Sequence, residues 1–317
     1  LYTPIMGINK NANELTTLLS YVIIISIILT ALLSFIISRN ITKPLSNISQ
    51  AAANFASGNY QARATVLSDD EVGQLGSAFN EMAIKLEKID SNRREFLANV
   101  THDLKTPLAV IQALTETLLD DLVKAPEKKQ EYLQKILLEN KNMNLLISDL
   151  LNLAQLESGQ LSFHYEKINA TKYLRQHFES YQSLMKEKNL QLQLTIHDNL
   201  NEFFIDQQRL QQVLNNIMSN AIKYSPISGT IAVNISKNKD FLEITITDNG
   251  IGITANDLPF IWDRFYKADK SRNRKEGGTG LGLAITKMLV LAMKGTVTVK
   301  STPNVETCFT INLPFKS

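Results

Sequence analysis

A histidine inside a strongly helical stretch is the residue whose surroundings most clearly support chemistry. His102 is followed directly by Asp103, and Thr106 lies four residues further on, one helical turn away on the same face. A neutral imidazole is a good nucleophile near neutral pH. Asp103 can accept a hydrogen bond from one ring nitrogen, which leaves the other nitrogen free to attack a phosphorus atom. Pro107 removes a backbone hydrogen bond beside this histidine, so we predict a bend in the helix there.

A pair of asparagines interrupts an apolar helix predicted over residues 210–224. Asn216 and Asn220 lie one turn apart, so both side chains project from one face of that helix. Their two carboxamide oxygens could bind Mg²⁺, which prefers oxygen ligands. Lys223 follows at a position suited to a phosphate group, and Tyr224 offers an aromatic face to a base.

A strand predicted over residues 241–247 ends at Asp248, directly ahead of Gly250 and Gly252. A carboxylate at the end of a strand could accept a hydrogen bond from the exocyclic amine of adenine. The two glycines would let the backbone approach the adenine ring closely.

A glycine-rich run further along the chain opens a helix whose N-terminus can hold phosphate. It is not a P-loop, because no Gly-Lys-Ser/Thr follows, and its glycine spacing does not fit a dinucleotide fingerprint. The residues of this run that we expect to bind nucleotide are Gly278, Thr279, Gly280, Leu281 and Gly282.

The segment over residues 260–276 is long and polar for a connection, which favours a functional lid. Phe260 and Phe265 lie near its start, and we expect Phe265 to border the nucleotide. Its basic side chains could face phosphate groups; they are Lys267, Lys270, Arg272, Arg274 and Lys275.

The elements that must position these residues begin with a candidate membrane helix. Residues 15–38 carry no charge, and a helix that spans a bilayer takes roughly 20 apolar residues. Arg39 and Lys43 follow, which places the next part of the chain in the cytoplasm, although Lys10 weakens this asymmetry. Because the chain begins with leucine, we expect it to start within a longer protein. Residues 1–14 would then be the end of an extracytoplasmic sensor region.

The next two segments are predicted to be helical and to need a second chain. Residues 39–90 form two short helices, and the second carries apolar residues at 3-4-3-4-3 spacing: Val72, Leu75, Phe79, Met82, Leu86 and Ile89. This spacing is typical of a coiled-coil seam, so a parallel dimer is expected. Residues 91–160 form a helical hairpin that turns at 120–127, and two such hairpins would close a four-helix bundle.

Residues 161–317 mix helix and strand and are predicted to form an α+β sandwich of ordinary domain size. Alternating apolar residues predict strands at 230–236, 241–247, 296–301 and 307–313. Helices with apolar stripes are predicted near 170–188, 206–223 and 281–292.

Taken in this order, the motifs resemble a bacterial sensor histidine kinase of a two-component system. The Asp70-Glu71-Val72-Gly73 element and Phe79-Asn80-Glu81-Met82 look like parts of a HAMP domain, and the string around His102 resembles the family's H-box. The paired asparagines, Asp248 and the glycine runs are similar to the N-box and glycine boxes of the GHKL ATPase fold. The implied fold is multidomain: one transmembrane helix, a HAMP parallel coiled coil, a dimeric four-helix-bundle hairpin and a GHKL-type α+β sandwich.

This resemblance implies an enzyme that uses ATP to phosphorylate its own His102. The phosphoryl group would pass to an aspartate in the receiver domain of a response regulator, and Thr106 would help to dephosphorylate that regulator. In the family, the position of Asn220 binds Mg²⁺ and that of Asp248 reads adenine. The protein would be a homodimer in the plasma membrane of a bacterium, with its C-terminal part in the cytoplasm. Transfer within one subunit and transfer between subunits are both compatible with the sequence.

The composition of the chain excludes one class of partner and one kind of cross-link. The balance of 33 Lys+Arg against 31 Asp+Glu gives no reason to expect a nucleic-acid partner, and the single Cys308 excludes an intramolecular disulfide. His164, His177 and His197 lack the context of His102 and are interpreted as ordinary. Two other functions stay open: a GHKL-fold ATPase that couples hydrolysis to clamp closure, and a membrane-tethered dimer that binds its regulator without chemistry.

Overall fold

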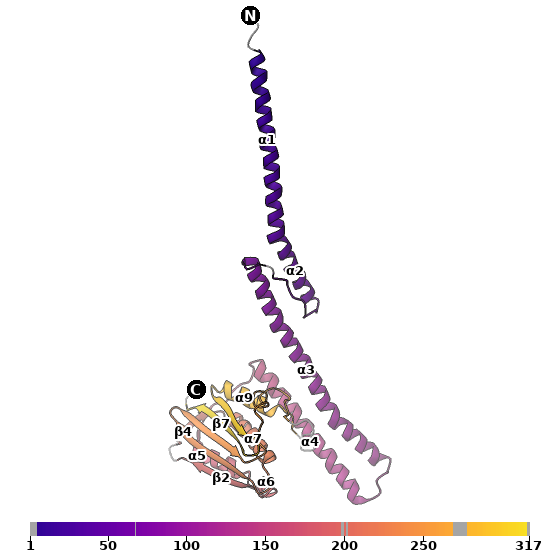
Figure 1. Cartoon of the computed structure of the whole chain (residues 1–317). Coiled ribbons are helices and arrows are strands. Elements are labelled where there is room, and N and C mark those ends of the chain that lie inside the picture. Colours follow the sequence, from indigo (N-terminus) through magenta and orange to yellow (C-terminus); the bar gives the residue numbers. More distant parts are fainter. Residues whose placement is uncertain (1–4, 67, 198–199, 201, 269–277, 316–317) are drawn as a thin grey trace. The chain divides into compact units, whose positions relative to one another are not determined.

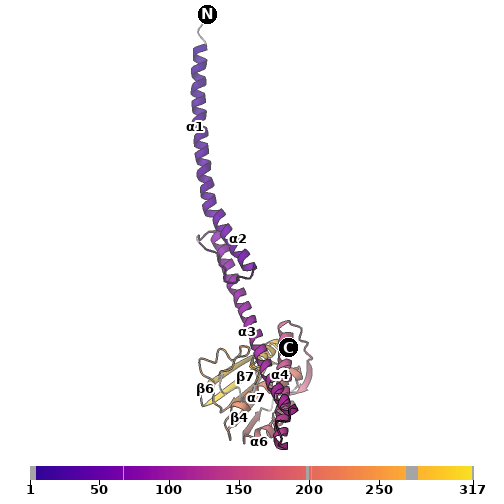
Figure 2. The ribbon, with the colours of Figure 1, turned by 90° about the vertical axis from the view of Figure 1, so that its right-hand side faces the viewer.

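The computed structural model describes residues 5–66, 68–197, 200, 202–268 and 278–315 (Figure 1). The chain divides into two compact units, Leu1–Leu97 and Ala98–Ser317. Helices make up the described part of the first unit. The second unit combines a helical hairpin with an α+β domain, whose sheet is seen from a second direction in Figure 2.

The first unit begins with a long apolar helix. Helix α1 (Ile5–Ile37) passes through a π-helical turn, η1 (Ser38–Thr42), into α2 (Lys43–Ala56). The stretch Glu14–Ala56 is long and apolar enough to cross a membrane, with a mean hydropathy of 2.6 in a window that has no buried residue. Helix α2 ends just before Gly58, whose φ of 100° stops the helix.

Helix α3 (Glu71–Leu119) begins at a cap that the sequence around Asp70 encodes. The carboxylate of Asp70 accepts the backbone N–H groups of Val72 and Gly73 at 3.1 and 3.0 Å. A Cβ on Gly73 would overlap the carbonyl oxygen of Ser68, so only glycine fits there. These contacts give the Asp-Glu-Val-Gly element its physical basis, because they satisfy the open N–H groups of the first helical turn.

A small core lies between α2 and the start of α3. Its buried residues are Ile48, Ala51, Phe55, Ala64, Phe79 and Ala83. Asn80 holds the connecting segment by accepting the N–H of Ala64 at 2.8 Å and donating to its carbonyl at 2.9 Å. The other apolar residues of the predicted seam include Leu75, Met82, Leu86 and Ile89, which stay 49%, 47%, 40% and 62% exposed.

The hairpin of the second unit is formed by the last part of α3 and by α4 (Pro126–Glu157). Helix α3 continues through Pro107 to Leu119. Large apolar side chains remain exposed along both arms: Leu108, Leu133, Leu137, Leu138, Leu145, Ile147 and Leu151. Another face of α4 is buried at Leu146, Asp149 and Leu153, a 3-4 spacing that lies along one side of the helix.

The α+β domain is built on a five-stranded sheet of order β2-β4-β5-β7-β6, in which only β2 and β4 are parallel. Its strands are β2 (Gln191–Ile196), β4 (Thr230–Asn238), β5 (Phe241–Asp248), β6 (Thr296–Thr302) and β7 (Glu306–Pro314). A small sheet pairs β1 (Glu166–Asn169) with β3 (Glu202–Ile205). The covering helices are α5 (Ala170–Glu179), α6 (Gln182–Lys186), α7 (Gln207–Tyr224) and α9 (Gly282–Ala292). Alternate residues of β4, β5 and β7 are buried, as expected for a sheet covered on one face.

The predicted strands and the helices α7 and α9 are confirmed, with ends shifted by at most about two residues. The single helix predicted over 170–188 was wrong, because the chain forms α5 and α6 with a break at Ser180. The hydroxyl of Ser180 bonds to the carbonyl of His177 at 2.6 Å, a local bond that competes with the helix. Strands β1, β2 and β3 were not predicted; they are short and their pairing partners lie far away in sequence.

We expect residues 41–158 to form a dimer, because the exposed seam of α3 and the exposed faces of the hairpin need an apolar partner. Sedimentation at micromolar concentration measures this directly. Leu86→Glu should shift the fragment toward monomer, whereas Lys85→Glu, a charge change at a neighbouring exposed position, should not. A monomeric unmutated fragment would contradict the prediction.

Candidate active site

His102 lies on an exposed face of α3, and its neighbour Asp103 determines the state of its ring. Nδ1 of His102 is 3.1 Å from Oδ1 of Asp103, and the His102 side chain is 71% exposed. In the tautomer that donates from Nδ1 to the Asp103 carboxylate, Nε2 keeps its lone pair. The arrangement therefore presents Nε2 to its surroundings as a nucleophile.

Thr106 lies one turn beyond His102, and its hydroxyl contacts the helix backbone. Oγ1 of Thr106 donates to the carbonyl oxygen of His102 at 3.1 Å. This back-bond is common for helical threonine. A hydroxyl that donates in this way can still accept a hydrogen bond from a molecule that docks beside His102.

The two asparagines of α7 have different surroundings. Nδ2 of Asn216 donates to the carbonyl of Gly282 at 3.0 Å and to Oγ1 of Thr286 at 3.3 Å. Asn216 thus ties α7 to the first turn of α9. Asn220 lies one turn later and is half-buried, and it remains the candidate of the pair for a metal ion.

Asp248 is the last residue of β5 and is only 4% exposed. Its Oδ1 accepts the backbone N–H of Gly250 at 3.0 Å. Burial raises the pKa of Asp248 to about 6, although this hydrogen bond acts in the opposite direction. A carboxyl group kept where its charge is disfavoured is typical of functional sites. Its carboxylate retains the capacity to accept a further donor, such as an adenine amine.

The glycines after Asp248 allow close packing within the protein itself. A Cβ on Gly250 would lie 2.5 Å from the carbonyl oxygen of Tyr224, and one on Gly252 would lie 2.5 Å from that of Thr302. Gly252 also has a φ of 69°, which favours glycine. We had expected these glycines to admit an adenine ring. The described contacts give a different reason for them, namely backbone packed against backbone.

The turn that precedes α9 depends on two glycines with positive φ. Gly278 and Gly280 have φ values of 128° and 69°, which residues with side chains rarely adopt. The N–H of Phe265 donates to the carbonyl of Gly280 at 3.0 Å, and a Cβ on Gly278 would lie 3.4 Å from Nζ of Lys223. The turn therefore lies between the start of the lid and the end of α7.

The end of α7 is fixed by a lysine that the sequence did not single out. Nζ of Lys188 donates to the carbonyls of Ile222 and Lys223 at 3.0 and 2.8 Å, which closes the helix terminus. Lys223 extends with its Nζ 5.0 Å from the centre of the Tyr224 ring. Through these contacts the fold brings together the predicted residues at the end of α7, the end of β5 and the turn before α9.

Two further residues join the hairpin to this site. Lys267 was predicted only as a basic side chain that could face phosphate, and Asp149 was not predicted. Nζ of Lys267 donates to Oδ2 of Asp103 at 3.1 Å. Oδ2 of Asp149, on α4, accepts the hydroxyl of Thr279 at 2.8 Å, and that hydroxyl lies 3.2 Å from the N–H of Leu281. Burial raises the pKa of Asp149. An acid within the apolar row of α4 was the signal that could have identified it.

The remaining predicted residues do not add to this group. Lys270, Arg272, Arg274 and Lys275 lie outside the described residues. His177 stacks on Tyr173 and meets Tyr181 edge to face, and burial lowers its pKa to about 4. The other two histidines, His164 and His197, have no contact with His102 among the bonds that the described residues form. Within those residues no three His, Cys, Asp or Glu side chains come together as a metal site.

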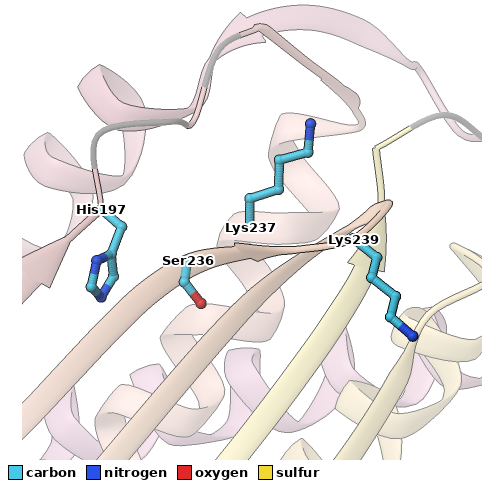
Figure 3. A pocket seen from close by; sticks show the side chains of 4 residues that line it. All are labelled: His197, Ser236, Lys237 and Lys239. Carbon is cyan, nitrogen blue, oxygen red and sulfur yellow. The ribbon is translucent and has the colours of Figure 1, made fainter.

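A shallow cavity of about 380 Å³ lies at the opposite end of the sheet. His197, Ser236, Lys237 and Lys239 line it, and the two lysines point away from each other (Figure 3). Asn238 of β4 pairs with Phe241, at the end of β5 remote from Asp248. Seven residues of strand separate the two ends by roughly 23 Å, so this cavity is distinct from the candidate site.

Three family descriptions match the chain. "Histidine kinase-, DNA gyrase B-, and HSP90-like ATPase" covers residues 205–317, "His Kinase A (phospho-acceptor) domain" covers 92–159, and "HAMP domain" covers 36–88. The matched ranges contain, respectively, the nucleotide motifs, His102 and the small core of the first unit.

Curated relatives extend over most of the chain. The sensor histidine kinase YclK of Bacillus subtilis (strain 168) is 33% identical over 322 residues, which cover 99% of this chain and 67% of YclK. The signal transduction histidine-protein kinase BaeS of Escherichia coli (strain K12) is 29% identical, over 93% of this chain and 62% of BaeS. The crystal structure of ShkA in complex with AMPPNP matches at 25% identity with a TM-score of 0.54, over 70% of this chain and 46% of ShkA. The chain thus spans about two thirds or less of each of these proteins.

We expect Asp248→Asn to stabilise the α+β domain and to weaken ATP binding. A pKa of about 6, against the ordinary 3.8, means that the folded state favours the protonated carboxyl group of Asp248. The stability that this protonated group contributes is therefore lost as the pH rises from about 4 through 6. At pH 7 the substitution should raise the free energy of unfolding by about 2 kcal/mol. Losing the acceptor for adenine should weaken ATP binding by about one to two decades.

Thermal unfolding at pH 4 and 7, together with calorimetric titration of ATP, measures both effects. Asp240→Asn, at an exposed turn, is the matched control and should change neither. Unchanged ATP affinity in Asp248→Asn would remove this residue from the site.

Proposed function

The chain belongs to the bacterial sensor histidine kinases, and on this premise we propose that it transfers the γ-phosphoryl group of ATP to its own His102. The phosphoryl group then passes to an aspartate in the receiver domain of a response regulator. The ATPase family match implies that residues 205–317 bind ATP.

The observation that carries this proposal is the state of the His102 ring. With the Nδ1 proton donated to Asp103, Nε2 holds an exposed lone pair. That lone pair attacks the γ-phosphorus while the bond between this phosphorus and the bridging oxygen breaks, and ADP leaves with the bonding electrons. Asp103 stabilises the positive charge that develops on the ring. Positioning and charge neutralisation supply most of the catalysis in phosphoryl transfer.

The nucleotide is held by residues that the fold has already brought together. Asp248 accepts the adenine amine, and Tyr224 lies beside the base. Lys223 faces the phosphates across the turn of Gly278 and Gly280. A helix N-terminus attracts anions, so we place the phosphates at the first turn of α9, from Gly282 on. The N–H of Leu281 donates to Oγ1 of Thr279 at 3.2 Å, which shapes the turn that precedes this helix.

A Mg²⁺ ion fits the donors of this site. Mg²⁺ prefers oxygen ligands and commonly binds through few protein groups plus phosphate oxygens. The half-buried carboxamide of Asn220 would supply the protein oxygen. When bound, the ion neutralises phosphate charge. Asn216, whose amide nitrogen is bonded to Gly282, instead keeps α7 in register with α9.

The N-terminal helix and the HAMP domain suggest a membrane-anchored protein. We place it in the plasma membrane of a bacterium, with the part that follows Arg39 and Lys43 in the cytoplasm. There it has access to ATP and to its regulator. Two chains form the active homodimer, because the exposed apolar faces of the hairpin require a partner.

We expect His102→Gln to abolish autophosphorylation and to leave ATP affinity unchanged, because the acceptor lies on α3 and the nucleotide residues lie in the α+β domain. Incubation with γ-labelled ATP measures this, and the label on the unmutated protein should be acid-labile and base-stable. His197→Gln, in the remote cavity, is the control and should label normally. Hydrolysis of ATP without label on the protein would favour a GHKL ATPase. The absence of both label and hydrolysis would favour a non-catalytic tether.

We expect Thr106→Ala to keep autophosphorylation and to slow dephosphorylation of the regulator by about 100-fold, if the hydroxyl orients the attacking water. Thr115→Ala is a matched control, because Oγ1 of Thr115 makes the same back-bond, to the carbonyl of Ile111 at 2.7 Å. Label uptake from ATP and decay of the phosphorylated regulator with added ADP are the two assays. If the phosphorylated regulator decays equally fast with both variants, Thr106 has no role in dephosphorylation beyond its hydrogen bond to the helix backbone.

A further inference from the structure

The hairpin and the ATP-binding domain of a single chain are joined by polar contacts along both arms of the hairpin. On α3, Asp103 binds Lys267, and on α4, Asp149 binds Thr279. Further along α4, Asn152 accepts from Arg209 at 3.3 Å and Glu157 forms an ion pair with Arg264. These contacts attach the ATP-binding domain to the α3 and α4 helices of its own chain.

The contact on α3 leads from the histidine to the phosphate-binding turn. Asp103 binds Nδ1 of His102 through one oxygen and Nζ of Lys267 through the other, each at 3.1 Å. The stem of Lys267 lies against the turn, because a Cβ on Gly280 would be 3.3 Å from its Cε. One aspartate and one lysine thus separate His102 from the turn that receives the phosphates of the same chain.

The contact on α4 fixes the same turn from a second side. Asp149 is 8% exposed and binds the hydroxyl of Thr279, the residue before Gly280. Leu146 and Leu153, which flank Asp149 on α4, are 4% and 1% exposed. The Asp149 side of this contact is therefore buried, while Thr279 is partly exposed. Two contacts from two helices therefore hold the turn in one register against the hairpin.

The connection between α4 and the domain is also fixed to its own chain. It comprises residues 158–165, and near its end the N–H of His164 donates to Oδ2 of Asp206 at 2.8 Å. Asp206 caps α7, the helix that carries the candidate metal residue Asn220. The nucleotide site thus stays attached to the adjacent hairpin through a short connection with its own hydrogen bond.

We propose that autophosphorylation takes place within one chain, so that each nucleotide site phosphorylates the His102 of its own subunit. Lys267 acts as a positioning residue in this transfer. It holds Asp103, and through it the His102 ring, next to the turn of Gly280. The proposal rests on the proposed kinase function and decides between the two routes that the sequence left open.

Mixed dimers of the full chain in detergent test the proposal. One chain carries His102→Gln and keeps its nucleotide site, and the other carries Asn220→Asp with Asp248→Asn and keeps its histidine. Two different affinity tags isolate the mixed dimer, and different chain masses identify the labelled chain after incubation with γ-labelled ATP. We expect neither chain of this dimer to be labelled. Label on the chain that lacks a nucleotide site would overturn the proposal.

A second mixed dimer is the positive control. It pairs an unmutated chain with a chain that carries all three substitutions, and the unmutated chain should be labelled. If unmutated homodimers take up no label, the kinase function itself fails. If the unmutated homodimers take up label and the first mixed dimer does too, the kinase function stands and only the proposal of transfer within one chain is overturned.

The second mixed dimer also tests Lys267. Lys267→Met in the chain with intact His102 should slow labelling by about tenfold, the loss expected for a hydrogen bond to a charged group, and Lys267→Arg should restore most of the rate. The same substitution in the inactive chain should have no effect. Lys300→Met, at an exposed site on β6, is the matched control. Slowing caused only by a substitution in the inactive chain would assign Lys267 to the opposite subunit's reaction and overturn the proposal.

Discussion

The carboxylate of Asp103 is shared between two groups, and the arrangement of the active site depends on this sharing. One oxygen accepts the Nδ1 proton of His102, and the other binds the ammonium group of Lys267. A single side chain therefore contacts the histidine that we propose as the nucleophile and also binds a lysine of the ATP-binding domain. Because the three groups form one network, a change at Lys267 reaches the histidine without touching it.

Two buried carboxyl groups are maintained against the preference of their surroundings. Desolvation raises the pKa of Asp248 to about 6 and also raises that of Asp149. Near neutral pH, ionisation of each buried carboxyl group lowers the stability of the folded state, whereas an uncharged residue at the same position would not. Asp248 is the residue that we propose as the acceptor for adenine, and Asp149 holds the turn of Thr279 and Gly280 against α4. An unfavourably buried carboxyl group at such a position is typical of a functional site.

The hairpin divides its apolar surface between two partners. The face of α4 that carries Leu146 and Leu153 is buried in the same chain, around Asp149. Another face, with Leu145 and Leu151, stays exposed, as do most residues of the seam on α3. One face of the helix therefore contacts the ATP-binding domain, while the other remains available for a second hairpin in the homodimer that we propose.

The sequence by itself determined several contacts between neighbouring residues, although it missed the local break at Ser180. Asp103 follows His102, so their hydrogen bond needs only a helix, and the caps at Asp70 and Asp206 are equally local. Motif order was enough to place the chain among the sensor histidine kinases, and apolar alternation located β4 to β7. Tertiary structure alone decided the contacts between Asp103 and Lys267, 164 residues apart, and between Asp149 and Thr279, 130 residues apart. It also showed that Gly250 and Gly252 are required where backbone meets backbone. Periodicity and propensity report on a few neighbouring residues, whereas these contacts arise only when distant segments pack together.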